Sequence, residues 1–313
     1  AVPTMSSNAH VPVLLGPVLE GLKIKPGGCY VDGTFGRGGH SREILKQLGD
    51  DGRLIAIDRD PQAIASGPSS LTEDPRVELL KGEIAQMETI IGERNLVGDI
   101  DGILFDLGVS SPQLDEANRG FSFMRDGPLD MRMDTDSGVS ASDWLAAVEE
   151  RELKQVLRKY GEENNAGRIA RAIVAARNES PVTRTAQLAR IVEVAAPKRG
   201  QKIHPATKTF QAIRIAINGE LEQLEAALEQ SVNVMKKGAR LCVISFHSLE
   251  DRIVKRFMRD ASRETEQYRG MPNVPEEFRP KLRLVGKAVS ATEAEIDANR
   301  RARSAHLRIA ERT

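Results

Sequence analysis

Residues 29–40 read Cys-Tyr-Val-Asp-Gly-Thr-Phe-Gly-Arg-Gly-Gly-His, and the fold is inferred from this stretch first. The first four residues are an apolar run of the kind found in buried strands, and glycine occupies four of the next seven positions. Because glycine has no Cβ atom, the backbone takes positive φ angles there and approaches a ligand closely. From His40 to Leu48 apolar side chains recur at helical spacing, and Gly49 ends the run. The stretch predicts a strand, a ligand-binding turn and a helix.

Further apolar runs of strand length follow, separated by helical stretches. They lie at 54–58, 77–80, 102–106 and 240–246, and we expect the last strands at 282–289 and 304–310. Strands that are apolar along their whole length and alternate with helices are typical of a parallel sheet covered on both faces. The sequence therefore predicts a Rossmann-like, doubly wound α/β domain.

Between the fourth and fifth of these strands the alternation stops. Residues 115–207 contain helical patterns at 143–160, 169–176 and 188–195, and no run that resembles a buried strand. We therefore expect an inserted all-α domain over 115–207. The sheet domain would then be discontinuous, formed by 1–114 and 208–313. Its second part should begin with a long helix that is broken near Asn218-Gly219.

Composition excludes several classes of protein. Hydrophobic residues make up 40% and charged residues 29% of the 313, which is typical of a soluble globular chain. No apolar run approaches the ~20 residues that span a bilayer, so we expect a cytoplasmic protein without a membrane partner. The two cysteines, Cys29 and Cys242, are too few for a disulfide framework, and the five histidines show no metal-ligand spacing. No metal is expected.

Charge is unevenly distributed along the insertion, although the formal net charge is zero. Residues 115–150 hold three basic and nine acidic side chains, whereas 151–214 hold fourteen basic and five acidic, a net of +9. Such asymmetry marks a surface for a polyanion or, equally, a solvated helical face. The candidate RNA-binding side chains are Arg168, Arg171, Arg177, Arg184, Lys198, Arg199 and Lys202.

The glycine-rich turn alone does not identify its ligand. Asp58 ends the second strand twenty residues beyond Gly38, where a carboxylate accepts hydrogen bonds from ribose hydroxyls in dinucleotide enzymes and methyltransferases alike. Asp32, at the tip of the first strand, favours the second class. It would repel a pyrophosphate by ~4 kcal/mol at about 4 Å, whereas it would attract the ammonium and sulfonium groups of S-adenosylmethionine. Ser41 also replaces the third glycine of the dinucleotide fingerprint. A nicotinamide-dependent oxidoreductase remains the alternative.

Two later segments supply further candidates. Asp106 ends the fourth strand, which should lie beside the first, so its carboxylate is expected near the reactive end of the cofactor. The alternative is an aspartate that caps a turn. His247 follows the fifth strand and is a weaker candidate, because a helix N-terminus with acidic residues in its first turn explains most of that segment.

Long blocks of this sequence resemble the MraW/RsmH family, bacterial methyltransferases that modify a cytosine N4 atom in small-subunit ribosomal RNA. The resemblance runs from about His10 to Arg312 and rests on blocks at 32–41, 56–63, 101–114, 119–133, 204–214 and 244–258. It implies a Rossmann-like methyltransferase domain with a helical insertion, and S-adenosylmethionine as the cofactor. It also implies a partner, the 16S ribosomal RNA at the decoding centre, that composition does not reveal.

Carried over by position, the cofactor contacts of the family fall on Gly38, Gly39, His40, Asp58, Ile84, Asp106 and Gln113. Ile84 stands where the family usually has an aromatic residue. The cytidine amino group must rehybridise as it attacks, and Asp106 or a backbone carbonyl near Val109 to Pro112 would accept its hydrogen bonds. We assign this second, catalytic role to Asp106 as a hypothesis. Methylation at carbon 5 would instead need a cysteine thiolate, and neither cysteine follows a strand. A non-catalytic ribosome assembly factor remains a further alternative, and the oligomeric state is left open.

Overall fold

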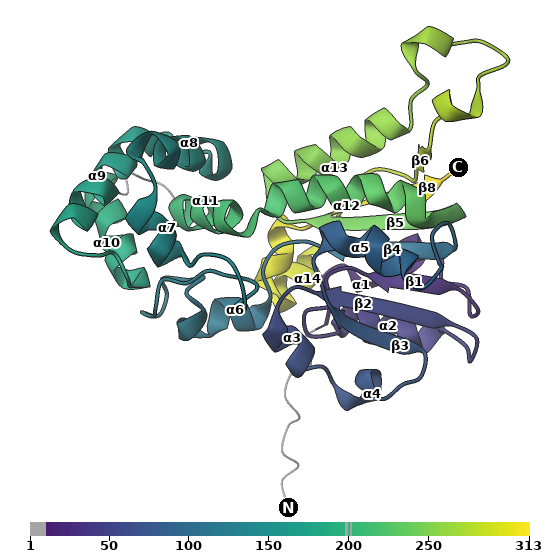
Figure 1. Cartoon of the computed structure of the whole chain (residues 1–313), viewed down its shortest axis with the longest axis horizontal. Coiled ribbons are helices and arrows are strands. Elements are labelled where there is room, and N and C mark those ends of the chain that lie inside the picture. The colour runs from purple at the N-terminus through teal and green to yellow at the C-terminus, as the bar shows by residue number, and fades with distance from the viewer. Residues whose placement is uncertain (1–10, 198–199, 201) are drawn as a thin grey trace, which may run out of the picture. The chain divides into compact units, whose positions relative to one another are not determined.

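The computed structural model of the chain describes residues 11–197, 200 and 202–313. They divide into two compact units, of which one runs up to Gly108 and resumes at Gln223, and the other is Val109–Glu222 (Figure 1). The first unit contains the sheet and the second is helical. These boundaries differ from the expected 114 and 208.

The sheet of the first unit has the topology of a doubly wound fold. Its strands are β1 Cys29–Asp32, β2 Arg53–Asp58, β3 Val77–Lys81, β4 Ile100–Asp106, β5 Met235–Ser245, β6 Leu282–Leu284, β7 Val289–Ser290 and β8 His306–Arg312. Their order is β3-β2-β1-β4-β5-β8-β6, and β7 also pairs with β8. β1 to β5 are parallel, whereas β8 is antiparallel to β5. Strand order reverses between β1 and β4, which is where such sheets bind ligands.

Helices cover both faces of this sheet (Figure 1). They are α1 Leu15–Leu22, α2 Gly39–Gln47, α3 Pro61–Ala65, α4 Ser69–Thr72, α5 Met87–Gly92, α12 Glu220–Val234, which enters this unit at Gln223, α13 Ser248–Ala261 and α14 Glu293–Ala298. Successive side chains of a strand point to opposite faces. In β2, Ile55 and Ile57 therefore join the core under α5, α12 and α13, whereas Leu54 and Ala56 join the core under α1, α2 and α4.

The helical unit packs around a core of its own. Its helices are α6 Ser111–Asp115, α7 Ala141–Ala147, α8 Glu150–Gly161, α9 Ala166–Glu179, α10 Thr185–Ala195 and α11 Thr207–Asn218. Phe210 and Ile213 of α11 are buried in this core, so the unit extends to Glu222 and not only to 207. Gly219, with φ of +56°, ends α11, and the break expected near Asn218-Gly219 is confirmed.

Two of the expected elements are divided in the structure. The helix predicted over 143–160 is α7 and α8, because Val148 takes an extended conformation between them. The guanidinium of Arg177 donates from Nη1 to the carbonyl oxygens of Leu145, at 2.8 Å, and of Val148, which satisfies the free carbonyl groups at the end of α7. The strand predicted over 282–289 is β6 and β7, with Gly286 at a φ of +69° between them.

None of the helices within residues 11–197 and 202–313 combines the length and the apolar character needed to cross a membrane. Within the same ranges, no group of three or more His, Cys, Asp or Glu side chains is placed to hold a metal ion.

Candidate active site at the switch point of the sheet

The turn after β1 is held in shape by the carboxylate of Asp32, which is almost fully buried. Its Oδ1 atom accepts from the backbone N of Thr34 at 3.0 Å, and its Oδ2 atom accepts from Ser41 Oγ at 2.7 Å. Burial raises the pKa of this carboxyl group, and the hydrogen bond from Ser41 opposes that rise. The sequence predicts a direct attraction between Asp32 and the ligand. In the structure its oxygens instead bind the turn itself.

Asp58 ties the same turn to the end of β2. Its Oδ2 atom accepts from the backbone N of Gly36 at 2.7 Å, and its Oδ1 atom accepts from the backbone N of Asp60 at 2.9 Å. Burial raises the pKa of Asp58 to about 6, and the two backbone hydrogen bonds counteract part of this. Each carboxylate oxygen has a second acceptor site. The side chain can therefore also accept from two ribose hydroxyls.

The glycines of the turn are required by its conformation and by their neighbours. Gly38 has a φ of +82°, and a Cβ atom there would lie 2.8 Å from both Leu71 Cδ1 and Phe35 Cζ. A Cβ atom at Gly39 would lie 2.7 Å from Pro12 Cγ, so the segment before α1 packs directly on the turn. At both positions the turn has no side chain, so its surface there is formed by backbone atoms.

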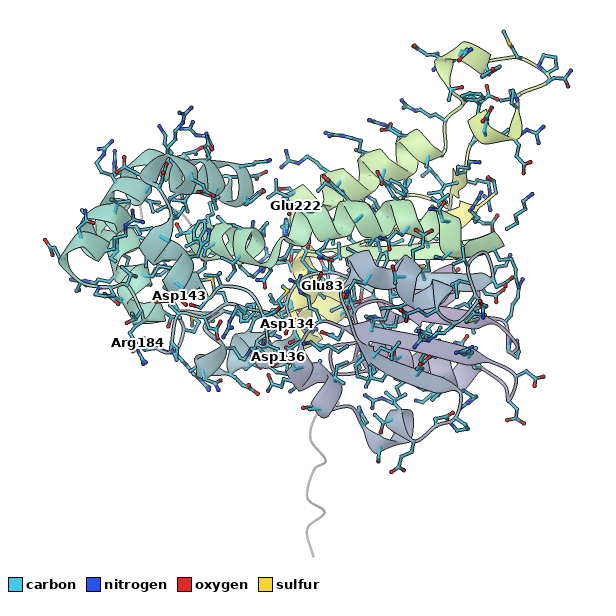
Figure 2. All side chains as sticks on the ribbon, viewed as in Figure 1. Glu83, Asp134, Asp136, Asp143, Arg184 and Glu222 are labelled. Atoms are coloured by element: carbon cyan, nitrogen blue, oxygen red, sulfur yellow. The ribbon has the colours of Figure 1, made fainter. Side chains whose placement is uncertain are left out.

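Ile84 follows β3 and lies against the turn. A Cβ atom built on Gly33 would be 3.3 Å from Ile84 Cγ2, which shows how closely the aliphatic side chain approaches. Gln223 of α12 fixes this segment: its Nε2 donates to Glu83 Oε2 at 2.7 Å, and its Oε1 accepts from the backbone N of Ala85 at 3.0 Å. Glu83 and its surroundings are drawn in Figure 2.

Asp106, at the end of β4, has one carboxylate oxygen that accepts no hydrogen bond among the described residues. Its backbone N donates to Thr34 Oγ1 at 2.6 Å, which joins the end of β4 to the turn. Its Oδ2 atom lies 3.5 Å from His40 Nδ1, whereas Oδ1 is buried and has no hydrogen-bond partner among the described residues. Burial raises the pKa of Asp106 to about 6; His40 lowers it, and the carboxylates of Asp32 and Glu250 raise it.

His247 and Gln113 have structural roles in their own helices. His247 is the N-cap of α13, where its Nδ1 accepts from the backbone N of Glu250 at 3.4 Å. Gln113 lies in α6 of the helical unit, and its Oε1 accepts from the backbone N of Ser110 at 2.9 Å in a capping box. The structure thus brings together Gly38, Gly39, His40, Asp58, Ile84 and Asp106 in the sheet unit. Gln113 belongs to the other unit.

Comparison with known proteins identifies the class to which this site belongs. Residues 7–313 match the MraW methylase family. The chain belongs to this family. It is therefore a methyltransferase, and its methyl donor is S-adenosylmethionine. The family match decides against the nicotinamide-dependent alternative.

Three solved structures are similar to this chain at low sequence identity. A candidate rRNA methylase from Clostridium thermocellum is 14% identical over 97% of this chain and 100% of its own, with a TM-score of 0.46. An rRNA methylase from Streptococcus thermophilus is 10% identical over 95% and 93%, with a TM-score of 0.41. A SAM-dependent methyltransferase from Aquifex aeolicus is 12% identical over 96% and 90%, also at 0.41. The assignment rests on the family match alone.

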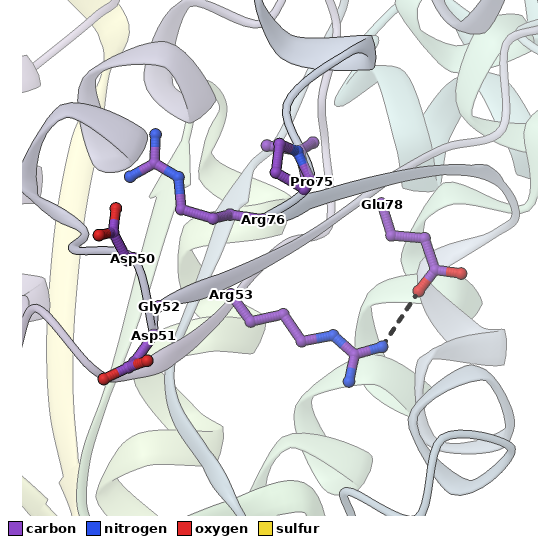
Figure 3. A pocket seen from close by; sticks show the side chains of 8 residues that line it. Asp50, Asp51, Gly52, Arg53, Pro75, Arg76 and Glu78 are labelled. Carbon is purple, nitrogen blue, oxygen red and sulfur yellow. Dashed lines mark hydrogen bonds and ion pairs between the residues drawn. The ribbon is translucent and has the colours of Figure 1, made fainter.

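The residues of this methylase fit its cofactor. The buried, unpartnered Oδ1 of Asp106 is an acceptor suited to a cationic or hydrogen-donating group, and Asp58 is suited to a ribose. A separate pocket of about 520 Å³ lies at the other ends of the strands, where β2 and β3 begin (Figure 3). Its arginines are already engaged, Arg53 with Glu78 at 3.5 Å and Arg76 with Asp74 at 2.8 Å, so it supplies no comparable site.

The candidate RNA-binding side chains of the methylase differ in their availability. Arg168, Arg171 and Lys202 are exposed. Arg184, labelled in Figure 2, is also exposed. It forms an ion pair with Asp126 at 3.0 Å. Arg177 is engaged at the end of α7, which leaves it unsuited to bind phosphate. The other two candidates, Lys198 and Arg199, lie outside the described residues.

Three further cations of the helical unit lie outside the set of RNA-binding candidates predicted from sequence. Arg151, Lys154 and Arg158 are exposed along one side of α8, and Arg168 and Arg171 are exposed on α9. Lys154 links the two helices, because its Cε atom would lie 3.3 Å from a Cβ atom built on Gly167 of α9. No acidic side chain among the described residues forms an ion pair with any of these five. We call them the α8/α9 basic seam. The spacing 151, 154 and 158, one helical stripe, was the available signal.

Proposed function

We propose that this methylase transfers a methyl group from S-adenosylmethionine to the exocyclic N4 atom of a cytidine in 16S ribosomal RNA, at the decoding centre. Family membership supports the chemistry, and the names of the two rRNA methylases above are in keeping with a ribosomal substrate. The observation that carries the proposal is the unpartnered Oδ1 of Asp106 at the switch point of the sheet. A ribosomal substrate would place the protein in the cytoplasm.

Asp106 answers the chemical difficulty of this reaction. The amino nitrogen of cytosine is a weak nucleophile because its lone pair is delocalised into the ring. When bound, S-adenosylmethionine supplies the methyl group to that nitrogen, which must then lose one proton. A carboxylate that accepts a hydrogen bond from the amino group helps the nitrogen rehybridise and takes up the developing charge. We assign this role to Asp106.

The cofactor would be held by the groups that shape the turn. Asp58 would bind the ribose hydroxyls, Ile84 would cover the adenine with an aliphatic side chain, and the backbone of the turn would approach the remainder. The full set of proposed cofactor contacts is Gly38, Gly39, His40, Asp58, Ile84, Asp106 and Gln113.

The cysteines support methylation at nitrogen over methylation at carbon 5. Burial raises the pKa of Cys29 to about 11 and that of Cys242 to about 12. Both lie within strands of the sheet, and neither would be a thiolate near neutral pH. Carbon-5 methylation requires a thiolate that attacks the ring.

The proposal is tested with small ribosomal subunits and labelled S-adenosylmethionine. We expect incorporation of one methyl group into 16S RNA, and mass spectrometry of the digested RNA should identify N4-methylcytidine. An Asp106→Asn variant should fold and lose most of its turnover. Full turnover by this variant would remove Asp106 from the chemistry, and methylation at carbon 5 or a lack of incorporation would overturn the proposed reaction. The latter would favour an assembly factor.

The α8/α9 basic seam is the surface we assign to RNA phosphates. Replacement of Lys154, Arg168 and Arg171 by Glu should weaken RNA binding and reduce the slope of log affinity against log salt by about 2, because each phosphate contact contributes ~0.7 with single strands. A matched reversal of three exposed lysines of the sheet unit, Lys23, Lys25 and Lys287, should leave the slope unchanged. Equal effects of the two sets would show that the seam is not the RNA surface.

A further inference from the structure

The imidazole of His40 is held in one orientation between two oxygen atoms. It is 6% exposed, its Nε2 atom lies 2.8 Å from the carbonyl oxygen of Val13, and its Nδ1 atom lies 3.5 Å from Oδ2 of Asp106. A carbonyl oxygen has no hydrogen to give, so Nε2 must be the donor and must carry a proton. The neutral ring would then face Asp106 with the lone pair of Nδ1.

This arrangement leaves an unfavourable contact unless one more proton is present. An unprotonated Nδ1 and an ionised Oδ2 would be two acceptors turned toward each other in a buried site. One proton between them removes the conflict, either as imidazolium with carboxylate or as neutral imidazole with carboxylic acid. Only the first alternative leaves Asp106 as a full acceptor at Oδ1.

We propose that His40 is a positioning residue of the methylase, which holds this proton on Nδ1 and so keeps Asp106 ionised, with Oδ1 free for the amino group of the substrate. The inference rests on the proposed function and adds a role to a residue otherwise assigned only to the cofactor. The proton lost by the methylated nitrogen goes to Oδ1, and the proton on Nδ1 stays. Asp106 then releases its proton to water as the product leaves, which restores the starting state.

The other charges around Asp106 make this role necessary. The groups that act on it are Asp32 from β1, Glu250 from α13 and His40 from α2. Glu250 accepts from the backbone N of Phe246 at 3.0 Å and is itself buried. Two neighbouring carboxyl groups and burial therefore favour the neutral acid at Asp106, and His40 is the group that opposes them. His247 contacts Glu250, with its Nε2 atom 3.4 Å from Oε1, so among these groups His40 is the imidazole that faces Asp106 itself.

The direct test is the titration of Asp106 in His40→Gln, whose amide can still donate to Val13 but carries no charge. Carbon-13 NMR of the carboxyl groups, with the Asp106 signal assigned by its absence from Asp106→Asn, reports the midpoint without any substrate. Loss of a nearby opposite charge should raise this midpoint by about 1 to 3 pH units. His306→Gln is the matched control, because that ring faces Ser290 on β7, and it should leave the midpoint unchanged.

The rate of methylation gives an independent reading. The acid limb of kcat should move to higher pH in His40→Gln, which for a two-unit shift lowers the rate about tenfold at pH 7 and restores most of it at pH 9. A purely structural role would lower the rate equally at every pH and leave the midpoint in place, and that result would overturn the inference. Failure of the wild-type protein to methylate cytidine would overturn the proposed function but not the titration.

A measurement on the unmodified protein covers the case in which His40→Gln does not fold. Nitrogen-15 NMR of the His40 ring should show a protonated Nδ1 at a pH where the Asp106 carboxyl group is ionised. An unprotonated Nδ1 beside a protonated Asp106 would contradict the assignment.

Discussion

Replacement of Gly38 by Ala tests whether the turn after β1 is built for close packing and for the cofactor. Gly38 has a φ of +82°, and a Cβ atom would lie 2.8 Å from atoms of both Leu71 and Phe35. The left-handed backbone costs an L-residue ~1–2 kcal/mol. Crowding of a packed region adds ~1–3 kcal/mol. We therefore expect the free energy of unfolding to fall by roughly 2–5 kcal/mol.

Gly98 provides a matched control, because it has nearly the same backbone angle without the crowding. Its φ is +85°, and a Cβ atom there would have no neighbour within 4 Å among the described residues. Gly98→Ala should therefore cost only the backbone component, ~1–2 kcal/mol. The difference between the two variants isolates the contribution of Leu71 and Phe35.

Urea denaturation measures both losses, and calorimetry with S-adenosylhomocysteine measures the effect on the cofactor site. Gly98→Ala should bind S-adenosylhomocysteine as the wild type does. Gly38→Ala should bind it at least ten times more weakly, because the turn must move to make room for the alanine side chain. Equal losses of stability would refute the packing argument. An unchanged Kd in folded Gly38→Ala would show that this turn does not hold the cofactor.

Three further predictions follow from other side chains. Asp58→Ala should weaken S-adenosylhomocysteine binding by about 150-fold, because two hydrogen bonds to a charged group are lost at ~1.5 kcal/mol each. Calorimetry would measure this loss. Arg177→Ala should lower the free energy of unfolding by ~1–3 kcal/mol because the carbonyl groups at the end of α7 lose their donor. Arg171→Ala should leave the free energy of unfolding unchanged and weaken RNA binding. Denaturation measures the first property and filter binding the second. The pKa of Asp106 is raised from 3.8 to about 6, so between these pH values the folded state binds a proton that the unfolded state has lost. The free energy of unfolding should therefore fall by ~3 kcal/mol as pH rises from about 4 to about 6. In Asp106→Asn, denaturation curves should no longer show this pH dependence.

The central sheet could be predicted from the sequence because its parallel strands are buried on both faces. Continuous apolar runs such as Leu54 to Ile57, which alternate with helical stretches along the chain, have few interpretations other than buried parallel strands. The last strands were harder to predict because β6 and β7 are short and lie near the sheet edge. The division between α7 and α8 was not predicted, and the donor to the carbonyl groups at the end of α7 is Arg177, which lies in α9, later in the chain.

The candidate site was predictable in position but not in detail. Asp58 and Asp106 end neighbouring parallel strands, and such ends meet at one edge of a sheet whatever the loops do. The partners of each side chain depend on tertiary contacts that no local pattern encodes. The ring of His40 lies between Val13 and Asp106 because a segment before α1 packs on the turn, and nothing in the block 32–41 indicates this.

The structure also changes which carboxylate explains the preference of the site for S-adenosylmethionine over a dinucleotide. From sequence, Asp32 discriminates against a pyrophosphate because it stands at the strand tip. In the structure its oxygens accept from Thr34 and Ser41 of its own turn, and the side chain is almost fully buried. Asp106 is the carboxylate with an oxygen left over, and Asp32 raises its pKa. A region with several carboxyl groups and one histidine rejects phosphates and accepts cations or hydrogen donors. The preference predicted for Asp32 is therefore a property of the cluster, in which the buried Oδ1 of Asp106 is the acceptor that has no partner among the described residues.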